Sequence, residues 1–218
     1  SRAIEAREIW LEEPEVFVET VRYLLQRPDI QHERISMVGF SIGASVALVA
    51  AADPRIASNV RGLVFFGGYY SLVNYLTALA TREAVVDTRR VPWTAHDWAI
   101  ELAEHALQQQ GLSLADFRQD ADSVQLPPAV AERLRRASPD AHLHNLHTKV
   151  FILHDTSDAA VPWVESQKLK QALEPHLVGA YHISSLFEHV QPRRQMAPTI
   201  IIEVLLLSAF LYQVLEYL

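Results

Sequence analysis

The stretch ISMVGFSIGASVALVA, residues 35–50, passes from one kind of secondary structure to another without a break. Residues 35–40 form a short apolar run, which is typical of a buried strand. Residues 42–50 are rich in alanine, and the segment they begin stops at Asp53 and Pro54, where a helix cannot easily continue. The stretch therefore predicts a strand, a tight turn at Ser41 and a helix.

The rest of the chain repeats this alternation of strands and helices. Further buried strands are expected at residues 62–66, 150–153 and 180–186, and helices at residues 14–28, 161–173 and from about Pro198 to the end. Continuous apolar strands that alternate with helices indicate a parallel sheet. The predicted fold class is α/β, a mostly parallel sheet flanked by helices.

A long segment separates the second strand from the third. A crossover between parallel strands needs about a dozen residues, whereas residues 69–148 lie between these two strands. Helical patterns occur in this segment at residues 72–79, 95–109 and 129–136. We therefore expect a core made of residues 1–68 and 149–218, with residues 69–148 inserted as a helical cap.

Ser41 is the first candidate for chemistry because it lies between Gly39 and Gly43 at the predicted strand-to-helix turn. Flanking glycines remove Cβ atoms that would collide in such a turn, and the turn exposes the serine hydroxyl. The backbone amide of Ile42, at the start of the helix, would then face a reacting oxygen. A glycine-rich packing turn and a phosphate cradle are the alternatives, but no lysine follows the glycines as it does in a P-loop.

A serine hydroxyl needs a base, and the base needs a carboxylate to orient it. Asp158 follows the third strand, at the edge where parallel sheets build their sites, and Asp155 is its nearest rival. His189 lies between the expected last strand and the terminal helix. The chain order Ser41, Asp158, His189 is the order of this architecture.

On these three motifs the chain resembles the α/β-hydrolase superfamily, in its dienelactone-hydrolase and prolyl-oligopeptidase-like branch. The resemblance runs from about Pro14 to the end and rests on GFSIG at residues 39–43, DAAVP at residues 158–162 and the late His189. It implies that Ser41 is the nucleophile, His189 the general base and then acid, and Asp158 the residue that orients and stabilises His189. It implies no cofactor.

Two departures from the family pattern affect these expectations. Asp155 stands where the family usually has a glycine after its histidine. Only residues 1–34 precede the first predicted strand, so the fold is expected to be N-terminally incomplete, and no glycine-bearing loop is present to supply the second oxyanion amide. We expect the strand at residues 35–40 to be a bare edge, open to self-association or to completion by another segment.

The remaining residues exclude several classes of function. The 218 residues include 19 Lys and Arg against 26 Asp and Glu, so the net charge of −7 makes nucleic acid an improbable partner. With no cysteine there are no disulfides and no thiolate metal sites, and we expect no metal at the solvated histidines His142, His144 and His147.

Localisation stays open, with the cytoplasm favoured. Glu203 and Glu216 leave an uncharged run of only about 12 residues, which predicts a buried terminal helix and no membrane span.

The expected function is that of a serine esterase acting on a small-molecule acyl substrate. Tyr69, Tyr70 and Trp93 of the insertion are candidates for the wall of an apolar substrate pocket, although packing of the cap would explain them equally well. The alternatives are a prolyl-oligopeptidase-like serine peptidase, or a non-catalytic binding module or fragment that lacks the oxyanion loop.

Overall fold

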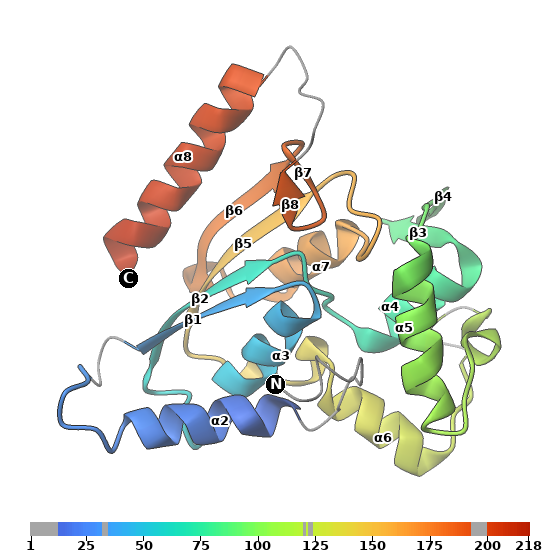
Figure 1. Ribbon diagram of the computed structural model, residues 1–218, viewed down its shortest axis with the longest axis horizontal. Helices are drawn as coiled ribbons and strands as arrows, with labels where there is room; N and C mark the ends of the chain where they lie inside the picture. Colours follow the sequence, from blue (N-terminus) through green and yellow to red (C-terminus); the bar gives the residue numbers. More distant parts are fainter. Residues whose placement is uncertain (1–12, 32–34, 120, 122–123, 193–199) are drawn as a thin grey trace.

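The centre of the protein is a sheet of four parallel strands. The computed structural model describes residues 13–31, 35–119, 121, 124–192 and 200–218. Its strands β1 (Ile35–Phe40), β2 (Val60–Phe66), β5 (Lys149–Asp155) and β6 (Val178–Ser184) lie in the order β1-β2-β5-β6 (Figure 1). The predicted α/β class and parallel sheet are confirmed. In the sheet as described, β1 is an edge strand that pairs with β2 alone.

Three helices cover one face of the sheet. They are α2 (Glu13–Leu24), α3 (Ile42–Ala51) and α7 (Val164–Ala172). Helix α3 is buried from Ala44 to Ala51, and its small alanines let it lie close against β1 and β2. Because Ile35 and Met37 point to this face, the main hydrophobic core lies between the sheet and these helices.

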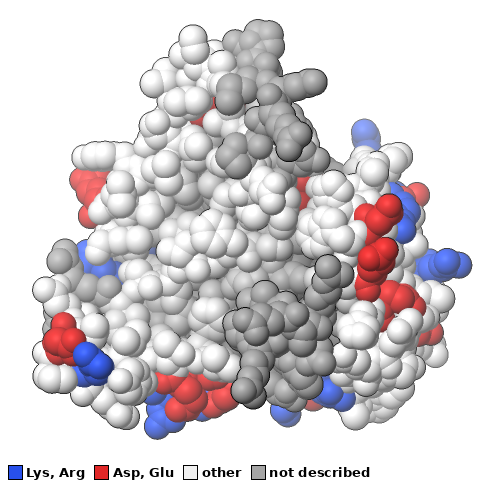
Figure 2. Space-filling model, in the orientation of Figure 1, with Lys and Arg blue, Asp and Glu red and all other residues white. Residues whose placement is uncertain are grey.

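Helix α8 (Ile200–Tyr217) lies on the opposite face, where it packs mainly against β6 (Figure 1). Only Phe210 and Val214 of α8 are buried. Ile200, Leu207 and Tyr217 are partly buried, and its other large apolar side chains are exposed, so the prediction of a buried terminal helix is wrong. By length and composition alone, α8 is apolar enough to cross a membrane. In Figure 2 the region of α8 is mostly free of charged side chains.

Residues 69–148 form their own small core beside the end of the sheet. The predicted helices are α4 (Leu72–Thr81), α5 (Asp97–Gln108) and α6 (Pro128–Arg136), with short 3-10 turns at Leu114–Phe117, Pro139–Ala141 and Leu143–Asn145. A hairpin of β3 (Glu83–Val86) and β4 (Arg89–Pro92), which the sequence did not predict, connects α4 to α5. Its turn places Asp87 at φ 55°.

The connection from β6 to α8 contains a second hairpin. After the 3-10 turn Pro175–Leu177 and β6, strands β7 (Phe187–Glu188) and β8 (Gln191–Pro192) pair antiparallel. The tight turn between them holds His189 at φ 59°. This hairpin stands at the same end of the sheet as the cap (Figure 1).

Candidate functional site at the carboxyl edge of the sheet

Ser41 occupies the turn between β1 and α3 in a strained backbone conformation. Its φ of 55° and ψ of −139° are disfavoured for a residue with a side chain. The surroundings hold it there, because the Ser41 amide donates to the carbonyl of Phe66 at 2.8 Å and its own carbonyl accepts from Ala44. The geometry is that of a strand-to-helix elbow that presents a serine side chain.

The two glycines beside Ser41 differ in how strictly the fold requires them. A Cβ atom at Gly39 would collide with the backbone of Ala44 in α3. At Gly43 a Cβ atom would meet nothing within 4 Å. The expectation that both glycines avoid a collision is therefore right for Gly39 and wrong for Gly43.

The carboxyl ends of the four strands bring the predicted residues to one edge. Ser41 follows β1, Gly67 follows β2, Asp158 follows β5 and His189 follows β6. Gly67 lies beside both Asp158 and His189. A Cβ atom at Gly67 would stand 3.4 Å from Oδ2 of Asp158 and 3.7 Å from Nδ1 of His189. The topology therefore gathers residues that are far apart in the chain.

Asp158 and His189 form a buried pair. Oδ2 of Asp158 lies 2.7 Å from Nδ1 of His189, while Oδ1 accepts from the amides of Ala160 at 2.7 Å and Val161 at 2.9 Å. Burial alone would raise the pKa of Asp158, but hydrogen bonds from His154 and His189 outweigh it and hold the pKa well below its usual range. Asp158 is therefore an ionised carboxylate that fixes the orientation of the imidazole.

His154 is a second histidine on the same carboxylate. Its Nε2 lies 3.2 Å from Oδ2 of Asp158 and 3.0 Å from the carbonyl of Val161, and its Nδ1 lies 2.7 Å from Oγ of Ser166. The ring is fully buried. His154 therefore helps to hold the carboxylate of Asp158 in place.

Asp155, the rival acid, has a different set of partners. Its Oδ1 accepts from the amide of Ser157 and its Oδ2 from the amide of Phe187, both at 2.8 Å. These bonds tie the end of β5 to the hairpin that carries His189. Asp155 therefore positions the histidine turn, and Asp158 is the carboxylate that contacts the ring.

The ring of His189 faces the cap as well as the acid. Its centroid lies 6.1 Å from the ring of Trp98, at the start of α5. Among the described residues Ser41 and His189 share no hydrogen bond, although both lie at the same edge of the sheet. Such bonds are often long before a substrate binds. With Nδ1 on Asp158, Nε2 is the nitrogen left to exchange a proton.

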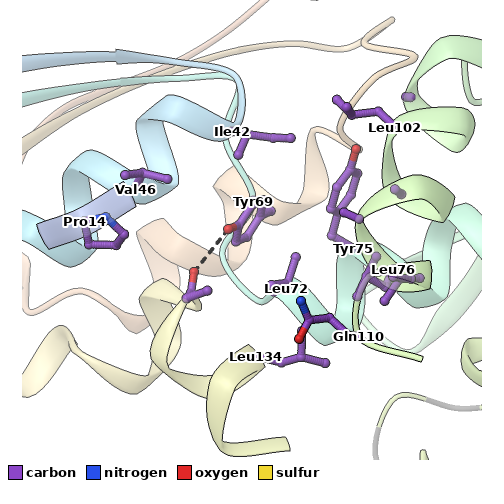
Figure 3. Close-up of a pocket in the computed structure, with 15 residues that line it drawn as sticks. Pro14, Ile42, Val46, Tyr69, Leu72, Tyr75, Leu76, Leu102, Gln110 and Leu134 are labelled. Atoms are coloured by element: carbon purple, nitrogen blue, oxygen red, sulfur yellow. Dashed lines mark hydrogen bonds between the residues drawn. The ribbon is translucent and has the colours of Figure 1, made fainter. Parts of the chain in front are cut away.

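A largely apolar pocket starts beside the elbow and extends into the cap (Figure 3). The side chain of Ile42, the residue after Ser41, forms part of its wall. The remaining wall comes from the start of α2 and from α3 to α6. The pocket encloses about 760 Å³ of empty space, open solvent included. A site for an apolar group therefore adjoins the predicted oxyanion donor.

Of the three residues proposed to line a pocket, only Tyr69 does so. It stacks on Tyr75 with ring centroids 5.6 Å apart, and its hydroxyl donates to the carbonyl of Ala137. Tyr70 packs against the main core instead. Trp93 donates from Nε1 to the carbonyl of Asp158 at 2.8 Å, so it steadies the acid turn. Sequence alone does not reveal which way these rings point.

No group of three or more His, Asp or Glu suited to a metal ion occurs within the described part of the chain. His142 makes a hydrogen bond with the carbonyl of Arg136 at 2.9 Å.

Comparison with known families gives one sequence match. The family described as "BAAT / Acyl-CoA thioester hydrolase C terminal" matches residues 13–115, which is slightly under half of the chain. The matched part contains the elbow and all of α5. No curated protein matches the chain by sequence.

Several solved structures resemble the protein in fold. A puromycin-hydrolyzing peptidase of Mycobacterium tuberculosis is 16% identical with a TM-score of 0.52, and the match covers 83% of this chain and 22% of the peptidase. An esterase of Pyrococcus furiosus is 13% identical with a TM-score of 0.50 over 94% of this chain and 62% of the esterase. For the acylaminoacyl peptidase of Pyrococcus horikoshii the values are 15%, 0.47, 78% and 22%. The chain thus spans about a fifth of the two peptidases.

Proposed function

The chain has the α/β-hydrolase fold, and from this we propose that it is a serine hydrolase that cleaves a carboxylic ester or a related acyl bond through an acyl-enzyme on Ser41. The observation that carries the proposal is the elbow itself: a serine at φ 55° on the same sheet edge as a hydrogen-bonded Asp158–His189 pair. Strained backbone of this kind persists where the surrounding structure enforces it, commonly at catalytic sites.

The chemistry follows from the roles of the three side chains. Ser41 Oγ attacks the acyl carbonyl, and Nε2 of His189 accepts the hydroxyl proton. Asp158 stabilises the resulting imidazolium through Nδ1. The Ile42 amide donates to the oxyanion, and His189 returns the proton to the departing alcohol or thiol. Water then attacks the acyl-enzyme, and His189 accepts a proton from this water. His189 returns a proton to Oγ of Ser41 as the carboxylic acid departs.

The bond to test first is a thioester. The family description names acyl-CoA thioester hydrolases, and a thioester differs from an ester only in its leaving group. A serine peptidase is the second candidate, because one structure of the same fold is a puromycin-hydrolyzing peptidase. Turnover of acyl esters and thioesters without turnover of peptide anilides would favour the first.

The decisive experiment is labelling by a fluorophosphonate probe, measured by intact mass. We expect one probe per chain, and no probe on Ser41→Ala or His189→Ala. Ser208→Ala is the matched control, since Ser208 lies exposed on α8, where its hydroxyl bonds only its own helix. Loss of one oxyanion donor typically costs about 10²–10³ in rate, so the chain should label slowly. Absence of labelling would contradict the proposal and favour a non-catalytic binding module.

A further inference from the structure

The pocket follows helix α5 away from the catalytic pair. Trp98, at the start of α5, lies beside the ring of His189. The α5 side of the pocket then continues with Ala99, Leu102, Ala103, Ala106 and Leu107 as far as Gln110. Ala99 and Leu107 are eight residues apart in the helix, so this part of the wall is about 12 Å long at 1.5 Å per residue, and Gln110 follows the end of α5. Gln110 therefore marks the end of the pocket that is remote from the chemistry.

Gln110 is the unusual residue in this wall. Its Oε1 atom is buried and has no hydrogen-bond partner among the described residues. Leu72 and Leu134, which line the same pocket (Figure 3), offer no polar atom in their side chains. The hydroxyl of Tyr69, which also lines the pocket, already donates to the carbonyl of Ala137 (Figure 3).

A buried amide oxygen without a hydrogen-bond partner destabilises a folded protein. Unsatisfied buried polar atoms in native structures call for an explanation, and Gln110 is the residue with such an atom that also lines this pocket, where a ligand group could meet it. None of the pocket-lining residues that the structure describes carries a charge. Burying an unpaired ion there would be strongly unfavourable, so the ligand group that meets Gln110 is neutral.

We propose that the pocket binds an acyl chain that carries a hydroxyl group at its far end, and that Gln110 hydrogen-bonds this hydroxyl. The proposal rests on the function proposed above for Ser41. A hydroxyl both donates and accepts, so it satisfies the amide of Gln110 whichever way that amide is turned. The apolar wall between Ile42 and Gln110 holds the intervening methylene groups. Gln110 is then a specificity residue for oxygenated acyl groups.

The test compares pairs of substrates on the unaltered protein. Octanoyl, dodecanoyl and hexadecanoyl thioesters are measured beside their ω-hydroxy counterparts. At the chain length that reaches Gln110, kcat/KM for the hydroxylated member should exceed that of its partner by roughly tenfold, the value of one net hydrogen bond. A preference for the plain chain at every length would overturn the proposal.

A matched pair of variants then assigns the effect to one side chain. Gln110→Met keeps the length of the side chain and removes the amide, so it should abolish the preference. Gln108→Met, on the exposed side of the end of α5, should leave it intact. If both variants keep the preference, Gln110 does not read the hydroxyl.

A binding measurement separates this proposal from the catalytic one. Titration calorimetry of Ser41→Ala with dodecanoic and ω-hydroxydodecanoic acid needs no turnover. Tighter binding of the hydroxy acid to Ser41→Ala, together with no turnover of either thioester by the unaltered protein, would support the pocket assignment and contradict only the hydrolase. Equal binding of the two acids, at this length and at the neighbouring lengths, would overturn the pocket assignment.

Discussion

Nδ1 of His189 lies 2.7 Å from Oδ2 of Asp158, although the two residues are 31 positions apart in the chain. The same carboxylate accepts two backbone amides on its other oxygen. Its negative charge is therefore neutralised from several sides in a buried place. The pair combines a structural role with the proposed catalytic one.

Asp158→Asn should destabilise the protein in a pH-dependent way. The folded-state pKa of Asp158 lies below its ordinary value of 3.8. The carboxylate therefore contributes its stabilisation above that value and loses it as the pH falls toward the lower, folded-state pKa. We expect the variant to be about 1–3 kcal/mol less stable at neutral pH, with a smaller difference near pH 3. Urea titrations at both pH values measure this, and a difference that grows in acid would contradict it.

The elbow glycines should respond in opposite directions to alanine. Gly39→Ala forces a Cβ against the backbone of Ala44, and we expect a loss of about 1–3 kcal/mol or more. Gly43→Ala places a Cβ in open space within α3, where alanine favours the helix by roughly 0.5–1 kcal/mol. Thermal unfolding of the two variants side by side tests the contrast. Equal losses would mean that the elbow differs from the structure.

The strain at Ser41 should be measurable as a difference between two inactive variants. Glycine adopts φ 55° without a steric penalty, whereas alanine does not. Ser41→Gly should therefore be more stable than Ser41→Ala by about 1 kcal/mol, while neither reacts with the fluorophosphonate. Chemical denaturation compares them. An alanine variant as stable as the glycine variant would show that the serine backbone is relaxed.

Helix α8 should depend on very few side chains. Phe210 is 3% exposed and contacts the sheet side, whereas Leu205 is 65% exposed. Phe210→Ala should cost about 3–5 kcal/mol if α8 unfolds together with the sheet, and Leu205→Ala should change stability by less than about 0.5 kcal/mol. A large loss at Leu205, measured by the same denaturation, would show that the outer face of α8 is covered.

The sequence predicted the sheet and the elbow because both depend on local signals. A continuous apolar run, a glycine that must be small and an alanine-rich helix all lie within residues 35–50. The sequence also predicts the pairing of Asp158 with His189, because each residue follows a predicted strand and the carboxyl ends of parallel strands lie at one edge of the sheet. The catalytic roles of these residues stay predictions.

What the sequence did not predict depends on contacts between distant segments. The strands of the β3–β4 hairpin have only four residues each, β4 is exposed throughout and begins with two arginines, and Ala84 is the one buried residue of β3, so no buried pattern marks the hairpin. An apolar composition predicted burial for α8, but composition does not tell whether a partner covers the helix. Gln110 is one of three consecutive glutamines, and only the packing of α4, α5 and α6 shows which one lies in the pocket wall.

Because β1 is an edge strand, its local opening determines what share of the molecules has Ser41 in place for reaction. Hydrogen bonds from β2 hold this strand on one side only, in the sheet as described, and edge elements open locally at a lower free energy than central ones. Fraying of β1 would displace Ser41 while β2, β5 and β6 keep their core. At any moment the sample would then contain folded molecules with Ser41 held at the elbow and folded molecules with Ser41 displaced. Any chain that paired with the outer edge of β1 would increase the fraction of molecules with Ser41 held at the elbow, without touching the substrate.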